Sequence, residues 1–298
     1  MSKRVLTVLL ALFVLVSGAD TAQSKESHSD TRQSQVKQVS ANLDEVVDDS
    51  TRGVMNEQGR KVLREVVEKD ETGDKIKSQT EKLRPRVLRR TARTLALQKA
   101  VQWRYGRIQE LLKEHDSELD HIFDFSPLML RGGKVLPPVI AEAGAGYRVE
   151  SDTQASSTDR TFRIVQEARM VSTPPSWRDY LFRDYSSFEK EDVGVIPQNA
   201  KEREIWKEAA IKGWQMGLRQ ARRLYRNNLS ELVRDYKGIL KFRILAEQNM
   251  VSIPVVAEGE LGIEVQGKRL SVDRKVFRIT QPSSFQEVEK WIPKVGTE

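Results

Sequence analysis

The segment from Asn199 to Asn249 contains no proline, and it constrains the fold of this chain more than any other feature. Apolar side chains recur through it at steps of three and four residues, the period of an amphipathic α-helix. They are Trp206, Ala210, Trp214, Leu218, Ala221, Tyr225, Leu229, Leu232, Tyr236 and Ile239. At about 1.5 Å per residue such a helix would reach roughly 75 Å, longer than a compact domain of this size is wide. The pattern therefore predicts a long helix that either breaks or projects.

Local signals mark the beginning of this helix and its weak points. Asn199 is a suitable N-cap, and Glu202 lies three residues further on, where it would complete a capping box. The expected weak points are three glycines, Gly213, Gly217 and Gly238. The first two also form a stripe of small residues with Ala221, which lets another backbone approach closely. That stripe fits either packing within the chain or contact with a partner.

The N-terminus has the composition of an export signal. Lys3 and Arg4 precede an apolar run from Val5 to Val16, and small residues follow in Ser17-Gly18-Ala19. The run is shorter than the roughly 20 residues that span a bilayer as a helix. We therefore expect export to the periplasm with removal of a signal peptide over residues 1–19.

The residues before position 19 also fit the signal of a bacterial lipoprotein. Val16-Ser17-Gly18 is also the sequence that precedes the lipidated cysteine of bacterial lipoproteins, whereas this chain carries Ala19. Ala19 is either a natural cleavage residue or a replacement for a cysteine, and an alanine cannot be acylated. Because the chain contains no cysteine, it forms neither a disulfide nor a thiolate metal site.

The rest of the chain divides into three regions. Residues 20–50 are polar with isolated valines, too few apolar groups to offset the entropy of ordering, and they predict a flexible tether. Apolar residues at helical spacing predict an N-terminal helical region over residues 51–85. Residues 86–298 carry the main domain. The formal charge of +7 arises from 50 basic and 43 acidic residues that are interspersed, which is typical of a mixed, solvated surface.

Helix and strand signals both occur in the main domain and predict an α+β fold, with a small mixed sheet packed on the long helix. Before that helix we expect a long helix over 86–119, a buried loop over 128–141, a hairpin of strands 147–153 and 160–173, and a short helix over 177–182. Ser176 is the expected N-cap of the short helix. After the long helix we expect strands at 253–257, 261–265 and 274–279, a turn at Gly267-Lys268, and a helix over 285–291.

No set of side chains has the spacing of a catalytic or metal centre. The three histidines, His28, His115 and His121, lack metal-ligand spacing, and the glycine pairs lack the strand-to-helix setting of nucleotide-binding loops. An acidic cluster could support the acid–base chemistry of glycan cleavage, or form a solvated helix face. It consists of Glu114, Asp116, Glu118, Asp120 and Asp124. We predict no catalytic residue, no cofactor and no metal.

Basic residues flank two tyrosines of the long helix, Tyr225 and Tyr236. They are Arg219, Arg222, Arg223, Arg226 and Arg234. This arrangement is compatible with nucleic acid, with an acidic partner protein, or with arginine stems packed on the chain itself. A binding or scaffolding protein is the function class that these features favour.

Three motifs in sequence order carry a resemblance to a known family. They are Val-Leu-Pro-Pro-Val-Ile-Ala-Glu at 135–142, Val-Ser-Thr-Pro-Pro-Ser-Trp-Arg-Asp-Tyr-Leu at 171–181 and Asn-Met-Val-Ser-Ile-Pro-Val-Val-Ala at 249–257. Gly213-Trp214, Asn228-Leu229 and Arg234-Asp235-Tyr236 of the long helix add to them. Together they resemble the DotC family of type IVB secretion systems, most closely its conjugative-plasmid version called TraI, which is distinct from the relaxase of that name. The resemblance covers residues 88–279.

The resemblance implies a periplasmic, non-catalytic subunit of the outer-membrane core complex. Such subunits assemble with a DotD-like lipoprotein and help to place a DotH-like subunit at the outer membrane, and a homo-oligomeric ring is expected. The family has an acylated cysteine where this chain has Ala19, so an outer-membrane lipid anchor is implied only if residue 19 is natively cysteine. No nucleic-acid partner is expected.

The resemblance and the residue pattern together indicate which positions contact partners. These are the proline-bracketed loops and the small-residue stripe, namely Pro137, Pro138, Pro174, Pro175, Trp177, Gly213, Gly217 and Ala221. The alternative function is a periplasmic peptidoglycan-binding or glycan-cleaving protein that uses the acidic cluster. A further alternative is contact with transferred DNA through the arginines of the long helix.

Overall fold

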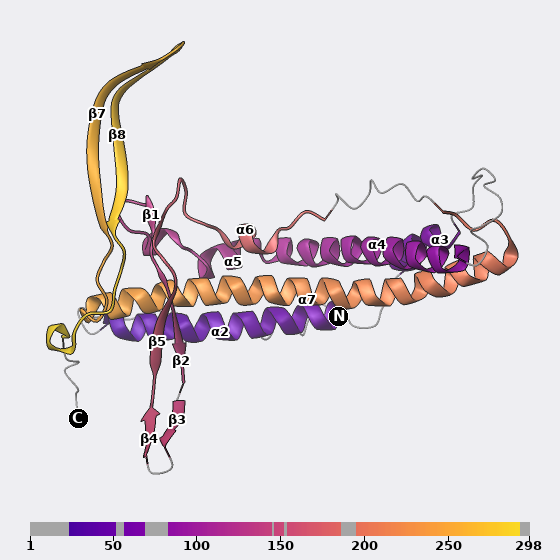
Figure 1. Cartoon of the computed structure of the whole chain (residues 1–298), viewed down its shortest axis with the longest axis horizontal. Helices are drawn as coiled ribbons and strands as arrows, with labels where there is room; N and C mark the ends of the chain where they lie inside the picture. Colours follow the sequence, from indigo (N-terminus) through magenta and orange to yellow (C-terminus); the bar gives the residue numbers. More distant parts are fainter. Residues whose placement is uncertain are drawn as a thin grey trace.

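The structure is a computed structural model that describes residues 24–51, 57–68, 83–144, 146–151, 154–185 and 195–292. These residues form an elongated helical rod, from which two β-hairpins project in opposite directions (Figure 1). The predicted α+β class is confirmed. Within the described ranges, no helix combines the length and apolarity needed to cross a membrane. The predicted signal peptide and Ala19 lie outside the described residues.

The axis of the rod is helix α7 (Ala200–Glu247), which is continuous over 48 residues. The helix therefore projects and does not break. The Asn199 side chain accepts a hydrogen bond from the Glu202 backbone N–H at 2.9 Å, which confirms the predicted N-cap. The Glu202 carboxylate reaches back to the N–H of Gln198, also at 2.9 Å, one residue before the expected position.

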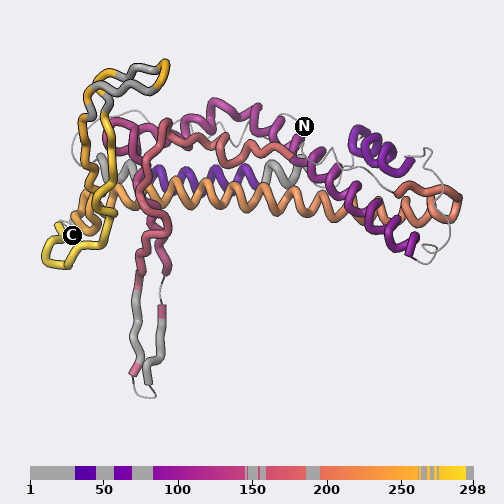
Figure 2. Tube along the Cα trace, turned by 45° about the horizontal axis from the view of Figure 1, so that its top comes forward, coloured from indigo at the N-terminus to yellow at the C-terminus, as the bar shows by residue number. Residues whose placement is uncertain are grey.

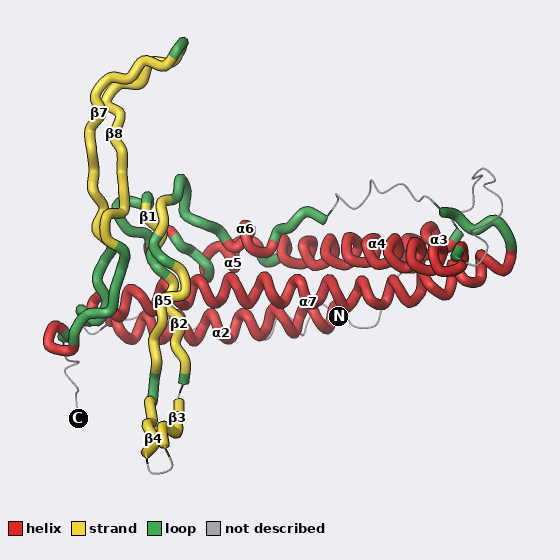
Figure 3. Tube along the Cα trace, in the orientation of Figure 1, coloured by secondary structure: helices red, strands yellow, loops and turns green. Residues whose placement is uncertain are grey.

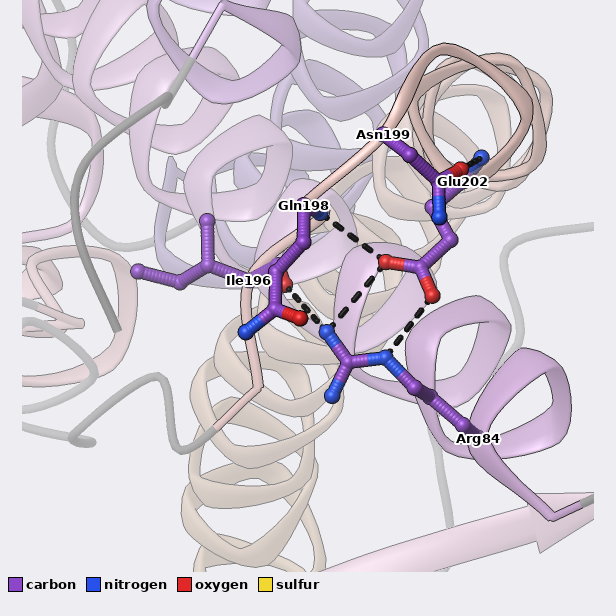
Figure 4. A network of polar contacts seen from close by, with 5 residues as sticks. All are labelled: Arg84, Ile196, Gln198, Asn199 and Glu202. Carbon is purple, nitrogen blue, oxygen red and sulfur yellow. Dashed lines mark hydrogen bonds and ion pairs between the residues drawn. The ribbon is translucent and has the colours of Figure 1, made fainter. Parts of the chain in front are cut away.

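The same carboxylate joins the beginnings of two helices. Figure 4 shows the Arg84 guanidinium between Glu202 and the carbonyl oxygen of Ile196. Arg84 Nε donates to Glu202 at 2.7 Å, and this hydrogen bond lowers the pKa of the carboxyl group. Because Arg84 is the first residue of helix α4 (Arg84–Glu114), the pair aligns the N-terminal ends of α4 and α7.

Helix α4 runs parallel to α7 and packs against its small-residue stripe. A Cβ atom placed on Gly213 would lie 2.3 Å from the carbonyl oxygen of Arg93. One placed on Gly217 would lie 2.4 Å from the carbonyl oxygen of Leu97. Only glycine lets two helix backbones approach so closely. Gly213 and Gly217, which were expected to weaken α7, are instead its contact points with α4, and the third glycine, Gly238, contacts β2.

The N-terminal half of the rod has its own apolar core. Three alanines of α4, Ala92, Ala96 and Ala100, pack with Trp206 and Trp214 of α7. Helix α3 (Glu57–Val67) closes this core with Val66, whose carbonyl oxygen accepts a hydrogen bond from the Trp206 indole at 2.9 Å. Small residues on α4 thus provide the space that the large indole rings of α7 fill.

Helix α2 (Ser24–Thr51) corrects the prediction of a flexible tether over this part of the chain. Val36 and Leu43 are buried in the core of the C-terminal half of α7. The Arg226 guanidinium of α7 donates to Asp44 at 3.0 Å. The few apolar residues of this segment recur at helical spacing, so one stripe suffices to dock it on α7. Tertiary packing, rather than helix propensity, stabilises such a helix.

The strands form four antiparallel pairs, coloured yellow in Figure 3, in place of the mixed sheet that we expected. The pairs are β1 (Val135–Leu136) with β6 (Arg169–Met170), β2 (Val139–Ala143) with β5 (Thr161–Gln166), β3 (Gly146–Ser151) with β4 (Gln154–Thr158), and β7 (Val255–Gln266) with β8 (Arg269–Gln281). Of these pairs, only β3–β4 and β7–β8 are consecutive strands joined by short connections, and β2–β5 and β1–β6 continue the antiparallel pairing of β3–β4 as nested pairs.

These pairs form two arms. The central arm consists of β2–β5 continued by β3–β4, and the C-terminal arm consists of β7–β8. Both leave the rod near the C-terminal end of α7, as the view in Figure 2 shows. The predicted turn at Gly267-Lys268 joins β7 to β8. The strands expected at 253–257 and 261–265 merge into β7, because Gly262 adopts φ 65° at a bulge instead of ending the strand.

Shorter elements complete the fold. The helix predicted over 86–119 stops at Glu114, and α5 (Asp116–Ile122) follows after His115. Helix α6 (Trp177–Leu181) begins at the predicted N-cap Ser176, which forms a capping box with Asp179. Two 3-10 turns, η1 (Ser126–Leu128) and η3 (Val288–Lys290), occur at the arms' end of the molecule, and η3 replaces the helix expected over 285–291.

Candidate functional site

The three sequence motifs meet on the C-terminal half of α7, where the two arms emerge. We call this region the arm base. A Cβ atom on Gly238 of α7 would lie 2.3 Å from Val139 Cγ1 and 3.0 Å from the backbone of Ile140, so β2 lies directly on the helix. Ile140 of the first motif and Val251 of the third share an apolar cluster with Phe242 of α7.

The first and second motifs are also joined to each other. Strand β1 pairs with β6, with Val135 opposite Met170, and the Val171 N–H donates to the carbonyl oxygen of Lys134 at 3.0 Å. Leu136 lies in the same buried cluster as Trp177 of α6. Segments from three distant parts of the sequence therefore build one base for both arms.

Helix α6 is held on the arm base by two carboxylates of α5, Asp116 and Asp120, which belong to the acidic cluster. The Trp177 indole donates to Asp120 at 2.8 Å, and the Arg178 guanidinium donates to the same carboxylate at 2.5 and 2.9 Å. Arg178 also forms an ion pair with Asp116. The Arg178 hydrogen bond holds the pKa of Asp120 below its usual value.

This environment bears on the glycan-cleaving alternative. A carboxyl group that acts as a general acid needs a raised pKa so that it stays protonated near neutral pH. The guanidinium of Arg178 does the opposite at Asp120. Asp124 accepts the N–H of Ser126 at 2.9 Å and begins η1. Asp116 and Asp120 therefore hold α6 in place, and Asp124 holds the loop after α5.

A second contact of α6 reaches a buried carboxylate on α7. Asp235 is only 4% exposed, and the Tyr180 hydroxyl donates to it at 3.2 Å. Arg234 forms an ion pair with the same group at 2.7 Å, and Gln166 at the end of β5 donates to it at 3.4 Å. Burial raises the pKa of Tyr180, so its hydroxyl stays protonated and remains a donor. Asp235 thus links α7, α6 and the central arm.

A third contact fixes the end of α6. The Tyr105 hydroxyl of α4 donates to the carbonyl oxygen of Leu181 at 2.9 Å and accepts from the Asn228 amide of α7 at 2.9 Å. Burial raises the pKa of Tyr105 to about 12. The carbonyl at the end of this short helix therefore has a permanent donor, and α6 is attached to α4, α5 and α7.

The predicted contact residues contribute to the arm base and the rod more than to the surface. Six of them are buried: Pro137, Pro138, Trp177, Gly213, Gly217 and Ala221. Pro174 and Pro175 are half-buried. The glycine stripe is occupied by α4. Within the described residues, the large projecting surfaces are the two arms.

The polar contacts that hold α6 in place were not predicted from the sequence, although one of the residues involved carried a detectable signal. Asp235 falls between Leu232 and Tyr236 on the apolar stripe of α7, at a position where a carboxylate needs a partner in the fold. Asn228 entered only through the family resemblance, and neither its contact nor that of Tyr105 was predicted, because their partners come from elements distant in sequence.

The other predicted groups are separated in the structure. His115 and His121 lie at opposite ends of α5, and His28 belongs to α2. No group of three His, Asp or Glu side chains that could hold a metal ion occurs among the described residues. Of the α7 arginines, Arg226 pairs with Asp44 and Arg234 with Asp235. The Arg226 pair joins α7 to α2, whereas the Arg234 pair lies within α7.

The geometry defines an elongated helical scaffold whose motifs build a common base for two β arms. Comparison with family models identifies the family: the chain belongs to the TraI family of the type IV secretory system, described by conjugal DNA–protein transfer, whose model matches residues 82–293. A comparison with curated proteins gives no match. The expectation of a type IV secretion and conjugation protein is confirmed.

Proposed function

We propose that this chain is a DotC-like structural subunit of the outer-membrane core complex of a type IVB conjugative secretion system. In this role it is a non-catalytic periplasmic protein that assembles with a DotD-like lipoprotein. It helps to place a DotH-like subunit at the outer membrane. If residue 19 is cysteine in the native protein, acylation of that cysteine would anchor the subunit at the outer membrane.

The observation that carries this proposal is the convergence of the three motifs at the arm base. Residues that only stabilised a domain could be spread through the fold, whereas these motifs all serve to fix two projecting arms. Gly238, Val139 and Asp235 set the central arm on α7 through direct contacts. A rod with rigidly attached arms suits a subunit that must contact several neighbours at fixed positions.

The test is recovery of the complex from bacterial envelopes. The chain and its Ala19→Cys variant are expressed in conjugating cells, solubilised in detergent and purified, and the bait and its partners are identified by mass spectrometry. We expect DotD-like and DotH-like subunits with the bait, and a lipidated N-terminus only in the cysteine form. Failure of both forms to recover these subunits contradicts the proposal.

A second measurement separates this role from glycan cleavage. Glu114→Gln with Glu118→Gln alters the acidic cluster without touching the carboxylates that hold Arg178. Plasmid transfer by cells that depend on this variant should equal transfer with the unaltered chain. A loss of transfer by a folded double variant would support the catalytic alternative.

A further inference from the structure

Both outer edges of the C-terminal arm are free of strand partners among the described residues. β7 (12 residues) pairs only with β8 (13 residues). An isolated two-stranded hairpin is marginally stable in water, and open edges accept further strands. The rod supports the arm near its foot, where the Lys134 ammonium lies 3.9 Å from the centre of the Phe277 ring.

Apolar side chains of the arm remain in solvent. Val272 is 58% exposed and Val276 is 40% exposed. β-Branched side chains on a strand are stabilised by neighbours on an adjacent strand. A strand added at an edge would supply such neighbours and would also pair the free backbone groups.

The two strands carry opposite charge. β7 contains three glutamates and no basic residue, whereas β8 contains Arg269, Arg274, Lys275 and Arg278 with one aspartate. Within the arm, Lys275 pairs with Glu258 at 2.8 Å and with Glu260 at 3.3 Å. The acidic strand forms one outer edge of the arm, and the basic strand forms the other.

The opposite charges of the two edges favour pairing between unlike strands of two copies of this chain. Pairing β7 with another β7 would bring glutamates together, and pairing β8 with another β8 would bring basic side chains together. Pairing β8 of one arm with β7 of another repeats the acid–base contact already present between β7 and β8. Copies whose arms point the same way place these two strands antiparallel, as they are within one arm.

We propose that the C-terminal arm pairs edge to edge with the same arm of a second copy of this chain, β8 of one copy beside β7 of the next. The contact is head-to-tail, so repetition closes a ring when the rotation between copies permits it. This inference rests on the proposed role as an assembly subunit and names the surface that joins its copies.

The first test reverses one charge on the basic edge. Arg278 is exposed and lies opposite Ala257, so Arg278→Glu disturbs no charged pair in register with it. Arg163→Glu is the matched control, because Arg163 is an exposed strand residue of the central arm that also lies opposite an alanine, Ala141. Both are compared with the unaltered full chain by native mass spectrometry and light scattering.

We expect the unaltered chain to self-associate, and more weakly as salt increases. Arg278→Glu should raise the concentration for half-association about tenfold, since a cross-strand attraction becomes a repulsion. Arg163→Glu should leave it unchanged. A chain that stays monomeric, or equal effects of the two substitutions, would overturn the edge pairing.

The second test exchanges the charges of both strands. The variant Glu258→Lys, Glu260→Lys, Lys275→Glu, Arg278→Glu keeps the ion pairs within the arm with their signs reversed. It should self-associate but exclude the unaltered chain from its oligomers, which isotope labelling of one form reveals. Mixed oligomers in statistical proportion would contradict the inference.

Partner recovery separates this inference from the proposed function. If the unaltered chain recovers DotD-like and DotH-like subunits while Arg278→Glu does not change self-association, the edge pairing is wrong and the core-complex role stands. If the unaltered chain recovers neither subunit, the role itself is wrong. Protection of β7 or β8 from hydrogen exchange by another protein, without self-association, would assign the arm to that protein instead.

Discussion

Replacing Gly217 with alanine should destabilise the rod, although alanine is the better helix former. In an exposed helix, the change from glycine to alanine stabilises by about 1 kcal/mol. At Gly217 the new Cβ would lie 2.4 Å from the Leu97 carbonyl oxygen and 2.6 Å from Ala100 Cβ, whereas ordinary contacts begin at 3.4 Å. Helix α4 must therefore withdraw by about 1 Å or α7 must bend.

The expected net change follows from these two opposing terms. Overpacking a close contact typically destabilises by about 1–3 kcal/mol, and more where backbone must move. Withdrawal of α4 would also loosen the packing of Trp214 against the α4 alanines. Because the obstruction at Gly217 includes a backbone carbonyl, we expect the packing penalty to exceed the propensity gain and to leave a net loss of about 1–3 kcal/mol.

The control is Gly106→Ala on α4, where a Cβ would have nothing within 4 Å. That variant should gain up to about 1 kcal/mol from helix propensity. Urea unfolding followed by circular dichroism measures both changes. With a slope of about 3 kcal/mol/M, the midpoint should fall by about 0.3–1 M for Gly217→Ala and rise slightly for Gly106→Ala. A Gly217→Ala chain as stable as the unaltered protein would refute the close approach of α4 and α7.

Three further substitutions, one of them with a control, test the attachment of α6 and the beginning of α7. Tyr180→Phe should lower the free energy of unfolding by about 1.5–3 kcal/mol, because Asp235 loses a hydrogen-bond donor. The control is Tyr225→Phe, which should change the free energy of unfolding little, because the buried Tyr225 hydroxyl has no hydrogen-bond partner among the described residues. Because the pKa of Asp120 is lowered in the fold, its contribution to stability is complete above the ordinary carboxyl pKa of about 3.9 and is lost as pH falls through the folded-state pKa. Acid titration of unfolding should therefore be flatter for Asp120→Asn than for the unaltered chain. Asn199→Ala should lower the free energy of unfolding by about 0.5–2 kcal/mol, measured by urea unfolding, through loss of the N-cap.

The parts of the fold that the sequence predicts are those determined by contacts close in sequence. The period of α7, its cap at Asn199, the N-cap at Ser176 and the turn at Gly267 all depend on residues within a few positions of each other. Such local signals do not depend on contacts with distant parts of the chain. They were sufficient to establish the α+β class.

The errors concern elements stabilised from far away in the sequence. The α2 segment has few apolar residues, and these pack mainly against α7, so its helix depends on contacts distant in sequence. The sequence predicted a buried loop over the residues of β2, because Pro137 and Pro138 precede them. In the structure these residues form a strand, because they pair with β5. The small-residue stripe allowed two interpretations, and packing against α4 within the chain accounts for Gly213 and Gly217.

The arm base shows why the motifs contain so many residues that never reach the surface. Two arms that leave a rod in opposite directions can hold fixed positions only if the strands cannot slide on the helix that carries them. Gly238 opposes sliding because β2 packs directly against it, where a larger side chain would not fit. Asp235 opposes sliding because it accepts hydrogen bonds from Tyr180 of α6 and Gln166 of β5. Substitutions at the base should therefore alter the direction of the arms, and with it assembly, before they alter the surfaces of the arms themselves.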